Sequence, residues 1–365
     1  MVEWKKLGDV CTVHTGSQLN RNDMVEDGLY PVVNGGREFS GRTNSFNEKA
    51  NSITISQGGE SAGFVNWIVT DFWAGAHCYV VDPKYSVNRR FLYHTLKNKE
   101  REIQLSKQGA GIPGLNRNIL YKQIVPIPSL SEQTRIVGIL DTFTAAIENL
   151  IQQIAERRKQ YEYYRDELLD LEGKEGVEMK KISEVAKNYT GLTYKPENVS
   201  ETGTLVLRSS NIDEDSLVFN DNVFVQMEIS ERAKAKENDI LICVRNGSKR
   251  LVGKAAVINR ESDGMAFGAF MTVLRAFAIN YKYLFFVWQS DKVKVQYKGD
   301  EAMPIAQITS KDFQRIVIPV PSPKEQSHIV AILDTFEASI ANLEAQLKER
   351  EKQYEYYRNK LLTFE

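Results

Sequence analysis

Hydrophobic residues recur at alternating steps of four and three along two long stretches of the chain. The first run, called here the first seam, is Ile136, Leu140, Phe143, Ile147, Leu150 and Ile154. The second seam lies 193 residues further on and is Ile329, Leu333, Phe336, Ile340, Leu343 and Leu347. A repeat of 3.5 residues keeps one stripe of an α-helix turned toward a partner helix. The pattern therefore predicts two long coiled-coil helices, called the arms, and we expect them to pair with each other.

Each seam later contains an arginine, Arg157 in the first and Arg350 in the second, where the pattern predicts an apolar residue. A polar residue at a seam position costs stability and fixes the register of the pair. We expect both arginines to lie near the middle of antiparallel arms, close to a pseudo-two-fold axis, with neighbouring glutamates as their partners.

The arms belong to a longer duplication. Residues 128–169 and 321–362 are identical at 27 of 42 positions, and the openings Val2–Val10 and Val177–Val185 also match. A repeat of this length means that a whole module, a globular head followed by an arm, occurs twice. The predicted domains are a first head at 1–127, its arm at 128–172, a linker at 173–176, a second head at 177–318 and its arm at 319–365.

Short runs rich in β-branched residues, separated by glycine and asparagine, predict strands in both heads. In the first head they are 52–56, 64–70 and 78–82, followed by a polar helix over 88–107. In the second head they are 205–207, 223–225, 240–244, 255–258 and 271–274, followed by a helix over 280–298. The fold class predicted is α+β, with two α/β heads joined by two long antiparallel coiled-coil helices in a pseudo-two-fold duplication.

Charge is unevenly divided, although the whole chain carries a net charge of −1. The net charge is +3 over 1–127 and +2 over 173–318, against −4 over 128–172 and −2 over 319–365. A polyanion would therefore meet the heads rather than the arms. The excess is small, so charge favours nucleic-acid binding only slightly.

No motif in the sequence predicts catalysis or cofactor binding. Cys11, Cys78 and Cys243 are scattered and predict buried thiols in a reducing, cytoplasmic compartment, and the four histidines lack metal-ligand spacing. No apolar run approaches the roughly 20 residues of a membrane-spanning helix. The segment 109–114 matches G-x-G-x-x-G, but it follows a helical stretch instead of a strand, which favours a surface loop. The Asn/Asp-Pro-Pro-aromatic element of an adenine N6-methyltransferase is absent from the sequence.

Polar loops that follow a predicted strand in each head are the candidate DNA-binding elements. Arginine can recognise guanine and asparagine or glutamine can recognise adenine by paired hydrogen bonds, while serine and lysine hold phosphates. An ordinary solvated loop has the same composition, and for any single loop this is the favoured interpretation. Because such a loop follows an equivalent strand in both heads, DNA binding and an ordinary loop become about equally favoured. The candidates are Arg37, Arg42, Ser56, Gln57, Arg208, Asn211, Arg245, Asn246, Lys249 and Arg250.

The order head, arm, head, arm resembles the specificity subunit of type I restriction-modification systems. The resemblance rests on the Ile-Pro-x-Pro-Ser-x-x-Glu-Gln entries to the arms and on the Leu-Asp-Thr-Phe and Tyr-Glu-Tyr-Tyr-Arg blocks, each present twice. Residues 56–65 with Phe72-Trp73-Ala74 resemble one class of target recognition domain, and residues 239–258 with 267–270 resemble another. Heads vary widely in that family, so the resemblance assigns no DNA contact to a particular residue.

The resemblance implies a chain without catalytic activity that binds double-stranded DNA. Two unlike heads would each recognise a few base pairs of an asymmetric, bipartite target with an unread spacer. Two modification subunits, which carry S-adenosylmethionine, would methylate adenine, and two restriction subunits would join for cleavage. No cofactor or metal is expected on this chain and no membrane among its partners. The alternative is a coiled-coil scaffold whose heads bind proteins, and DNA binding with and without a modification subunit would separate the two.

Overall fold

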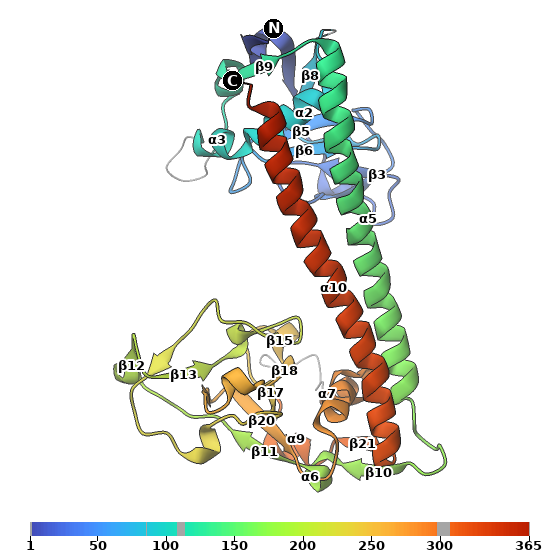
Figure 1. The fold of residues 1–365 in the computed structure, drawn as a ribbon, viewed down its shortest axis with the longest axis vertical. Coiled ribbons are helices and arrows are strands. Elements are labelled where there is room, and N and C mark those ends of the chain that lie inside the picture. The colour runs from blue at the N-terminus through green and yellow to red at the C-terminus, as the bar shows by residue number, and fades with distance from the viewer. Residues whose placement is uncertain (1, 85, 108–113, 298–306, 365) are drawn as a thin grey trace. The chain divides into compact units, whose positions relative to one another are not determined.

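A computed structural model describes residues 2–84, 86–107, 114–297 and 307–364, so most of the G-x-G-x-x-G segment lies outside the described residues. The chain forms two compact units, Met1–Gln153 with Leu343–Glu365, and Ile154–Asn342. Each unit therefore consists of one head, part of the arm joined to it, and part of the other arm (Figure 1).

The first head is built on a four-stranded antiparallel sheet of order β2-β8-β5-β6. A smaller sheet of order β4-β3-β7 has a parallel pair between β3 and β7, and a two-stranded ribbon joins β1 to β9. The strands are β1 (Glu3–Lys6), β2 (Cys11–Thr15), β3 (Tyr30–Val33), β4 (Gly41–Thr43), β5 (Ser52–Ser56), β6 (Val65–Ile68), β7 (Trp73–Ala74), β8 (Cys78–Pro83) and β9 (Ile124–Ile127). The α-helices of this head are α1 (Leu7–Val10), α2 (Arg89–Asn98), α3 (Glu100–Leu105) and α4 (Arg117–Lys122).

The second head repeats this plan with a four-stranded antiparallel sheet of order β11-β20-β17-β18. Its smaller sheet, of order β12-β16-β13-β19, again contains one parallel pair, between β13 and β19. The strands are β10 (Glu178–Lys181), β11 (Ala186–Thr190), β12 (Val199–Ser200), β13 (Thr204–Leu207), β14 (Ile212–Asp213), β15 (Ser216–Leu217), β16 (Phe224–Val225), β17 (Ile240–Cys243), β18 (Ala255–Val257), β19 (Ala266–Phe267), β20 (Met271–Ala276) and β21 (Val317–Val320). The α-helices are α6 (Ile182–Val185), α7 (Tyr281–Gln289), α8 (Asp291–Tyr297) and α9 (Ser310–Phe313).

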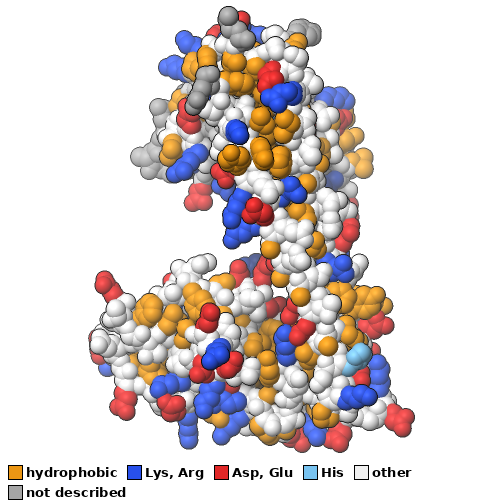
Figure 2. Space-filling model, in the orientation of Figure 1, with side chains coloured by type: hydrophobic (Ala, Val, Ile, Leu, Met, Phe, Trp, Pro, Cys, Tyr) orange, Lys and Arg blue, Asp and Glu red, His pale blue; other side chains and the backbone are white. Residues whose placement is uncertain are grey.

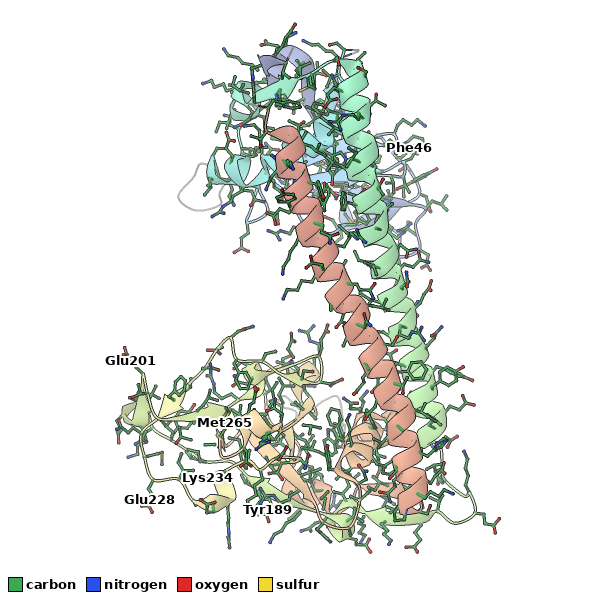
Figure 3. The ribbon with its side chains drawn as sticks, in the orientation of Figure 1. Phe46, Tyr189, Glu201, Glu228, Lys234 and Met265 are labelled. Carbon is green, nitrogen blue, oxygen red and sulfur yellow. The ribbon has the colours of Figure 1, made fainter. Side chains whose placement is uncertain are left out.

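Both heads place the four-stranded sheet between a helical layer and the smaller sheet. In the first head, Leu92 of α2 packs against one face of this sheet, and Phe72 packs against the other. In the second head, Leu284 of α7 packs against one face of the four-stranded sheet and Phe267 packs against the other. Tyr189 also packs against the core that contains Phe267 (Figure 3). The middle strands β5 and β17 are consequently buried at every position, which explains the uninterrupted apolar run of β17.

The arms are the helices α5 (Leu130–Leu169) and α10 (Pro323–Leu362). In the first unit, Ile136 and Leu140 of α5 are buried with Leu362 of α10. In the second unit, Leu333 of α10 belongs to the same core as Leu169 of α5. In each unit the beginning of one arm thus packs against the end of the other, so the arms are antiparallel, as the seams predicted.

Aromatic rings replace the expected glutamates as the partners of the seam arginines. The guanidinium of Arg350 lies 5.9 Å from the ring centroid of Phe143, and that of Arg157 lies 6.0 Å from the ring centroid of Phe336. The expectation of glutamate partners is therefore wrong, because the opposite arm presents a phenylalanine face to each guanidinium. The ring face attracts the planar cation, and the guanidinium of Arg350 also donates to the side-chain oxygen of Gln353 at 3.0 Å.

A buried glutamine explains the Glu-Gln pair that opens each arm. Gln133 accepts a hydrogen bond from the backbone N–H of Asn88 at 2.8 Å and donates one to Pro128 O at 2.9 Å. Gln326 makes the same two bonds, with Asn280 and Pro321, both at 2.9 Å. Because both asparagines cap the first helix of the helical layer, each glutamine ties its head to its arm.

Each predicted head helix is interrupted once. The predicted helix 88–107 is divided into α2 and α3 at Lys99, and the predicted helix 280–298 is divided into α7 and α8 at Ser290. Ser290 has extended backbone angles, and the break lets the second helix turn back onto the head and bury Val293. Tertiary packing of the second segment therefore overrides the local helical preference.

Candidate nucleic-acid interface

Loops that are far apart in the sequence meet where strand β5 ends in the first head. The backbone N–H of Gln57 donates to His77 O at 3.0 Å, and Leu115 N–H donates to Gln57 O at 2.7 Å. The backbone N–H of His77 also donates to the side-chain oxygen of Asn34 at 2.9 Å. We call residues 34–37, 57–61, 75–77 and 114–117 the first loop cluster.

Arg117 supplies an exposed cation at the edge of this cluster. Its guanidinium donates to the hydroxyl of Thr15 at 2.8 Å and lies 5.8 Å from the ring centroid of Tyr79. These three residues, with Gln57 and Asn116, line a shallow polar depression. A depression of this kind can accept a polar, anionic ligand.

The second head brings the matching loops together where β17 ends. Val244 N–H donates to Phe270 O, and Ile308 N–H donates to Val244 O, both at 2.9 Å. The side-chain amide of Asn246 donates to the hydroxyl of Ser209 at 3.1 Å and joins two of these loops. Residues 208–211, 244–250, 268–270 and 307–310 are called the second loop cluster. Its backbone bonds reproduce those of the first, which makes His77 and Phe270 equivalent.

Two glycines explain the Thr-Gly pair that occurs at the same place in both heads. A Cβ atom on Gly16 would stand 2.2 Å from Ala74 O, and one on Gly191 would stand 2.1 Å from Gly268 O. Neither position can carry a side chain, because the backbones of two strands meet there. The glycines therefore hold the smaller sheet against the larger one, beside each loop cluster.

Some of the predicted DNA-binding residues of the first head are exposed, and others stabilise the backbone of the head. Arg37 is exposed, with its guanidinium 5.6 Å from the Phe64 ring centroid, and Gln57 is half-buried in the cluster. Ser56 is buried and donates a long hydrogen bond to a backbone oxygen. Arg42 donates to Gly28 O at 2.6 Å and to a second backbone oxygen, so its guanidinium stabilises a turn.

The predicted residues of the second head divide in the same way. Arg245, Lys249 and Arg250 are exposed on the loop after β17. Arg208 forms an ion pair with an aspartate at 2.7 Å. Asn211 is fully buried, and its side-chain oxygen accepts from the backbone N–H of Arg208, so it shapes the loop from within. The roles of all these residues in DNA binding stay predictions.

Three residues of the clusters were not singled out from the sequence as DNA-binding candidates. His77 and Phe270 are both exposed, and Arg117 is the first residue of α4. The offset of 193 residues that relates the two arms also relates His77 to Phe270, so the duplication itself carried a signal for this pair. No comparable signal marks Arg117, because α9 begins with Ser310 where α4 begins with Arg117.

The remaining chemistry of the described residues points away from a reactive centre. The three cysteines are buried and free, as expected, and burial raises the pKa of Cys11 and of Cys78 to about 12. The described part of the chain holds no group of three His, Cys, Asp or Glu side chains placed to bind a metal ion. Within those same ranges, no helix is long and apolar enough to cross a membrane. Figure 2 shows cationic and anionic side chains interspersed over the visible face.

Comparison with known families identifies the duplicated module. Residues 1–157 and 174–352 both match the model of the type I restriction modification DNA specificity domain. The chain belongs to this family. The two matches correspond to the two head-and-arm modules, so the duplication seen in the sequence is a repeat of the family's own domain.

Relatives of similar length support this membership. A putative type I restriction enzyme specificity subunit of Haemophilus influenzae, S.HindORF215P, is 27% identical, with 100% of this chain and 96% of the relative covered. The EcoR124I/EcoR124II specificity subunit of Escherichia coli is 28% identical, with 100% and 94% covered. The S subunit structure from M. genitalium shares the fold, with a TM-score of 0.64, 19% identity and coverage of 100% and 97%.

Proposed function

We propose that this chain is the DNA-recognising subunit of a type I restriction-modification complex, and that each head recognises one half of an asymmetric, bipartite target through its loop cluster. The observation that carries this proposal is that both heads repeat the same backbone hydrogen bonds at the ends of β5 and β17. The side chains that follow these strands differ between the two heads. At the point where β5 continues into Gly58, β17 continues into Arg245, and His77 is replaced by Phe270. Two heads with the same backbone scaffold but different side chains in their loop clusters are suited to two different half-sites separated by an unread spacer.

DNA binding by the assembled complex tests this proposal. The methylated motif is first identified by methylation-sensitive sequencing of cells that carry the complex, and a duplex with this motif is then titrated with the purified complex. We expect tighter binding to this duplex than to one with both half-sites scrambled, and weaker binding to both as salt rises. Equal affinity for the two duplexes at every salt concentration would instead favour a scaffold whose heads bind proteins.

The methyl-transfer chemistry belongs, in this proposal, to partner subunits that carry S-adenosylmethionine. Its support is the sequence, which lacks the Asn/Asp-Pro-Pro-aromatic element that would hold a flipped adenine. The purified chain alone should show no stoichiometric heat of S-adenosylmethionine binding in calorimetry, whereas the complex should. Since the substrate is chromosomal DNA, we place the complex in the cytoplasm, where two restriction subunits can join it for cleavage.

Two copies of a modification subunit are the proposed partners of the arms. Tyr163 of α5 is 64% exposed and Tyr356 of α10 is 59% exposed, at equivalent positions of the two repeats. Each lies edge-on against the next tyrosine, with ring centroids 5.3 Å apart in both pairs. Exposed aromatic pairs are typical of interfaces, and their occurrence twice supports one kind of partner bound twice.

Subunit stoichiometry tests this assignment. Tyr163→Ala and Tyr356→Ala should each yield complexes with one modification subunit by native mass spectrometry, and the double variant should yield the free chain. Tyr163→Phe and Tyr356→Phe keep the rings and serve as controls. Retention of two modification subunits by the double alanine variant would show that the partners dock elsewhere.

A further inference from the structure

An exposed arginine stacks on an exposed aromatic ring at the tip of the second loop cluster. The guanidinium of Arg245 lies 5.3 Å from the ring centroid of Phe270, whose side chain is 57% exposed. Both residues are held by their backbones, because the N–H groups of Val244 and Arg245 donate to Phe270 O at 2.9 Å and 3.3 Å. The backbone hydrogen bonds therefore hold the two side chains next to each other.

The loop that carries Arg245 is braced on both sides. On one side, Arg245 forms a β-bridge with Gln307 of the neighbouring loop. On the other, Asn246 donates to Ser209 and accepts from Ser248 N–H at 2.9 Å, which closes a tight turn. A braced backbone and a stacked guanidinium lower the conformational entropy that binding would otherwise cost.

Stacking leaves the hydrogen-bonding rim of the guanidinium available. A phenylalanine ring offers one face to the cation and no hydrogen-bond acceptor, so stacking engages none of the donors of the planar fork. In the major groove, two such donors match O6 and N7 of guanine, and the match fixes both the distance and the direction of approach. A lysine has the charge but not the fork, so it would contact phosphates without selecting guanine.

The first head lacks this pair at the equivalent place. Gly58 occupies the position of Arg245, since it bridges Gly114 as Arg245 bridges Gln307, and His77 occupies the position of Phe270. The first loop cluster instead has Arg37, whose guanidinium lies over the ring of Phe64, and Arg117, which begins α4 and contacts Thr15. The two heads therefore direct their arginines from different loops, which distinguishes their half-sites.

We propose that Arg245 recognises a guanine of the half-site bound by the second head, and that Phe270 is the positioning residue that holds its guanidinium in the recognising orientation. This inference rests on the proposed function and names the base and the residues. The ligand is the major-groove edge of one guanine, and the first half-site serves as an internal reference because its loop cluster is untouched.

The first experiment reads the methylated motif in cells that carry variant complexes. Arg245→Lys and Phe270→Leu should relax the same base pair, a G·C pair in one half-site, and leave the other half-site unchanged. Phe270→Tyr keeps the ring face and should restore the parental motif. Arg260→Lys, an exposed arginine beyond the opposite end of β18, is the matched control and should keep the parental motif.

A binding measurement decides the matter even where a variant loses activity. Each guanine of the motif is replaced in turn by 7-deazaguanine, which lacks the N7 acceptor, and the affinity of the complex is measured. The parental complex should lose about 5- to 150-fold at one guanine of the second half-site. The Arg245→Ala complex should bind more weakly overall and show no further loss at that guanine.

The outcomes separate this inference from the function on which it rests. If the parental complex has no bipartite motif, the proposed function itself fails. If it has one, but Arg245→Lys keeps every base, or the relaxed pair is A·T, or Arg245→Ala stays sensitive to every deazaguanine, then the guanine assignment is overturned. If Phe270→Leu leaves the motif strict while Arg245→Lys relaxes it, the positioning role of Phe270 is overturned.

Discussion

In the first head the backbone leaves β5 through Gln57 and Gly58, and in the second it leaves β17 through Val244 and Arg245. The hydrogen bonds around these two exits are the same, whereas the side chains that they present differ. Cores and junctions follow the opposite rule, because Gln133 and Gln326 keep their identity and their partners. The two heads thus share their backbone scaffold and buried junctions, and they differ in the side chains that their loop clusters expose.

This division has a physical origin. A position that needs a buried glutamine, or a glycine between two strands, does not tolerate another residue, because a substitution there leaves a polar group unpaired or forces atoms together. An exposed loop end changes its side chain at little cost in folding free energy. Duplicated modules can therefore diverge at the loop clusters alone, and the following predictions test how complete the separation is.

The largest effect is expected at the close backbone contact that both heads share. Gly16→Ala and Gly191→Ala should each lower the free energy of unfolding of their own head by about 3 kcal/mol, because the new Cβ would collide with a carbonyl oxygen. Hydrogen exchange followed by mass spectrometry, which resolves β2 from β11, measures each head separately.

Gly58→Ala and Gly247→Ala are the matched controls for this pair. A Cβ atom at either position has open space around it, so both changes should alter the free energy of unfolding by less than about 0.5 kcal/mol. If only one of Gly16→Ala and Gly191→Ala is destabilising, the two heads do not share the contact in solution.

A transplant between the heads should produce an intermediate effect. Gly58 has no atom within 4 Å of an added Cβ, so the double change Gly58→Arg with His77→Phe can install the stacked pair in the first head. The first half-site should then gain a guanine requirement worth about 1–3 kcal/mol of discrimination, while the second stays unchanged. The methylated motif of the variant complex reports both halves at once.

Gly58→Arg alone is the control for the transplant, because it adds the cation without the ring that orients it. We expect this single variant to bind all sequences more tightly without a new base preference. A motif that stays unchanged in the double variant would show that the tips of the two heads are not interchangeable.

The smallest effect concerns pH, at the junction between head and arm. His94 of α2 is fully buried in the first unit, with hydrogen bonds to Asp141 at 2.8 Å and Tyr354 at 3.1 Å. Burial holds the pKa of His94 below its usual 6.5, although the hydrogen bond to Asp141 opposes the shift. The stability gained from the neutral imidazole is therefore complete above about pH 6.5 and is lost as the pH falls through the lowered pKa.

The second unit carries Phe286 at the equivalent position of α7, and the half-buried carboxyl of Glu337 accepts a long hydrogen bond from the hydroxyl of Tyr161. Burial raises the pKa of Glu337 on α10 above its usual 4.5, so its contribution is complete below about pH 4.5 and is lost as the pH rises through the raised pKa. The two junctions should therefore respond to acid in opposite directions. Urea unfolding at pH 7.5 and pH 5.5 should show a loss of stability for the first unit that His94→Phe removes. An equal loss in the His94→Phe variant would assign the pH dependence to another group.

The sequence by itself determined the arms and the duplication. A 3.5-residue repeat and an identity of 27 in 42 positions are properties of one chain read along its length, and no distant partner is needed to detect them. The β-branched residues of β5 and the continuous apolar run of β17 could also be recognised from the sequence, because both strands are buried at every position. The Glu-Gln entries were visible too, although their reason, the bond to the cap of the head helix, was not.

Tertiary structure alone decided what each loop residue does. Strand β1 finds its partner β9 only after the whole head has been traversed, and the parallel pair of β3 with β7 has no local signature. Arg42 and Asn211 have the composition of DNA-binding residues, yet one donates to turn carbonyls and the other is buried. Phe270 acquires its place beside Arg245 from hydrogen bonds between segments 25 residues apart. Such roles depend on burial and on the direction of each side chain, and only the packing of distant segments fixes these.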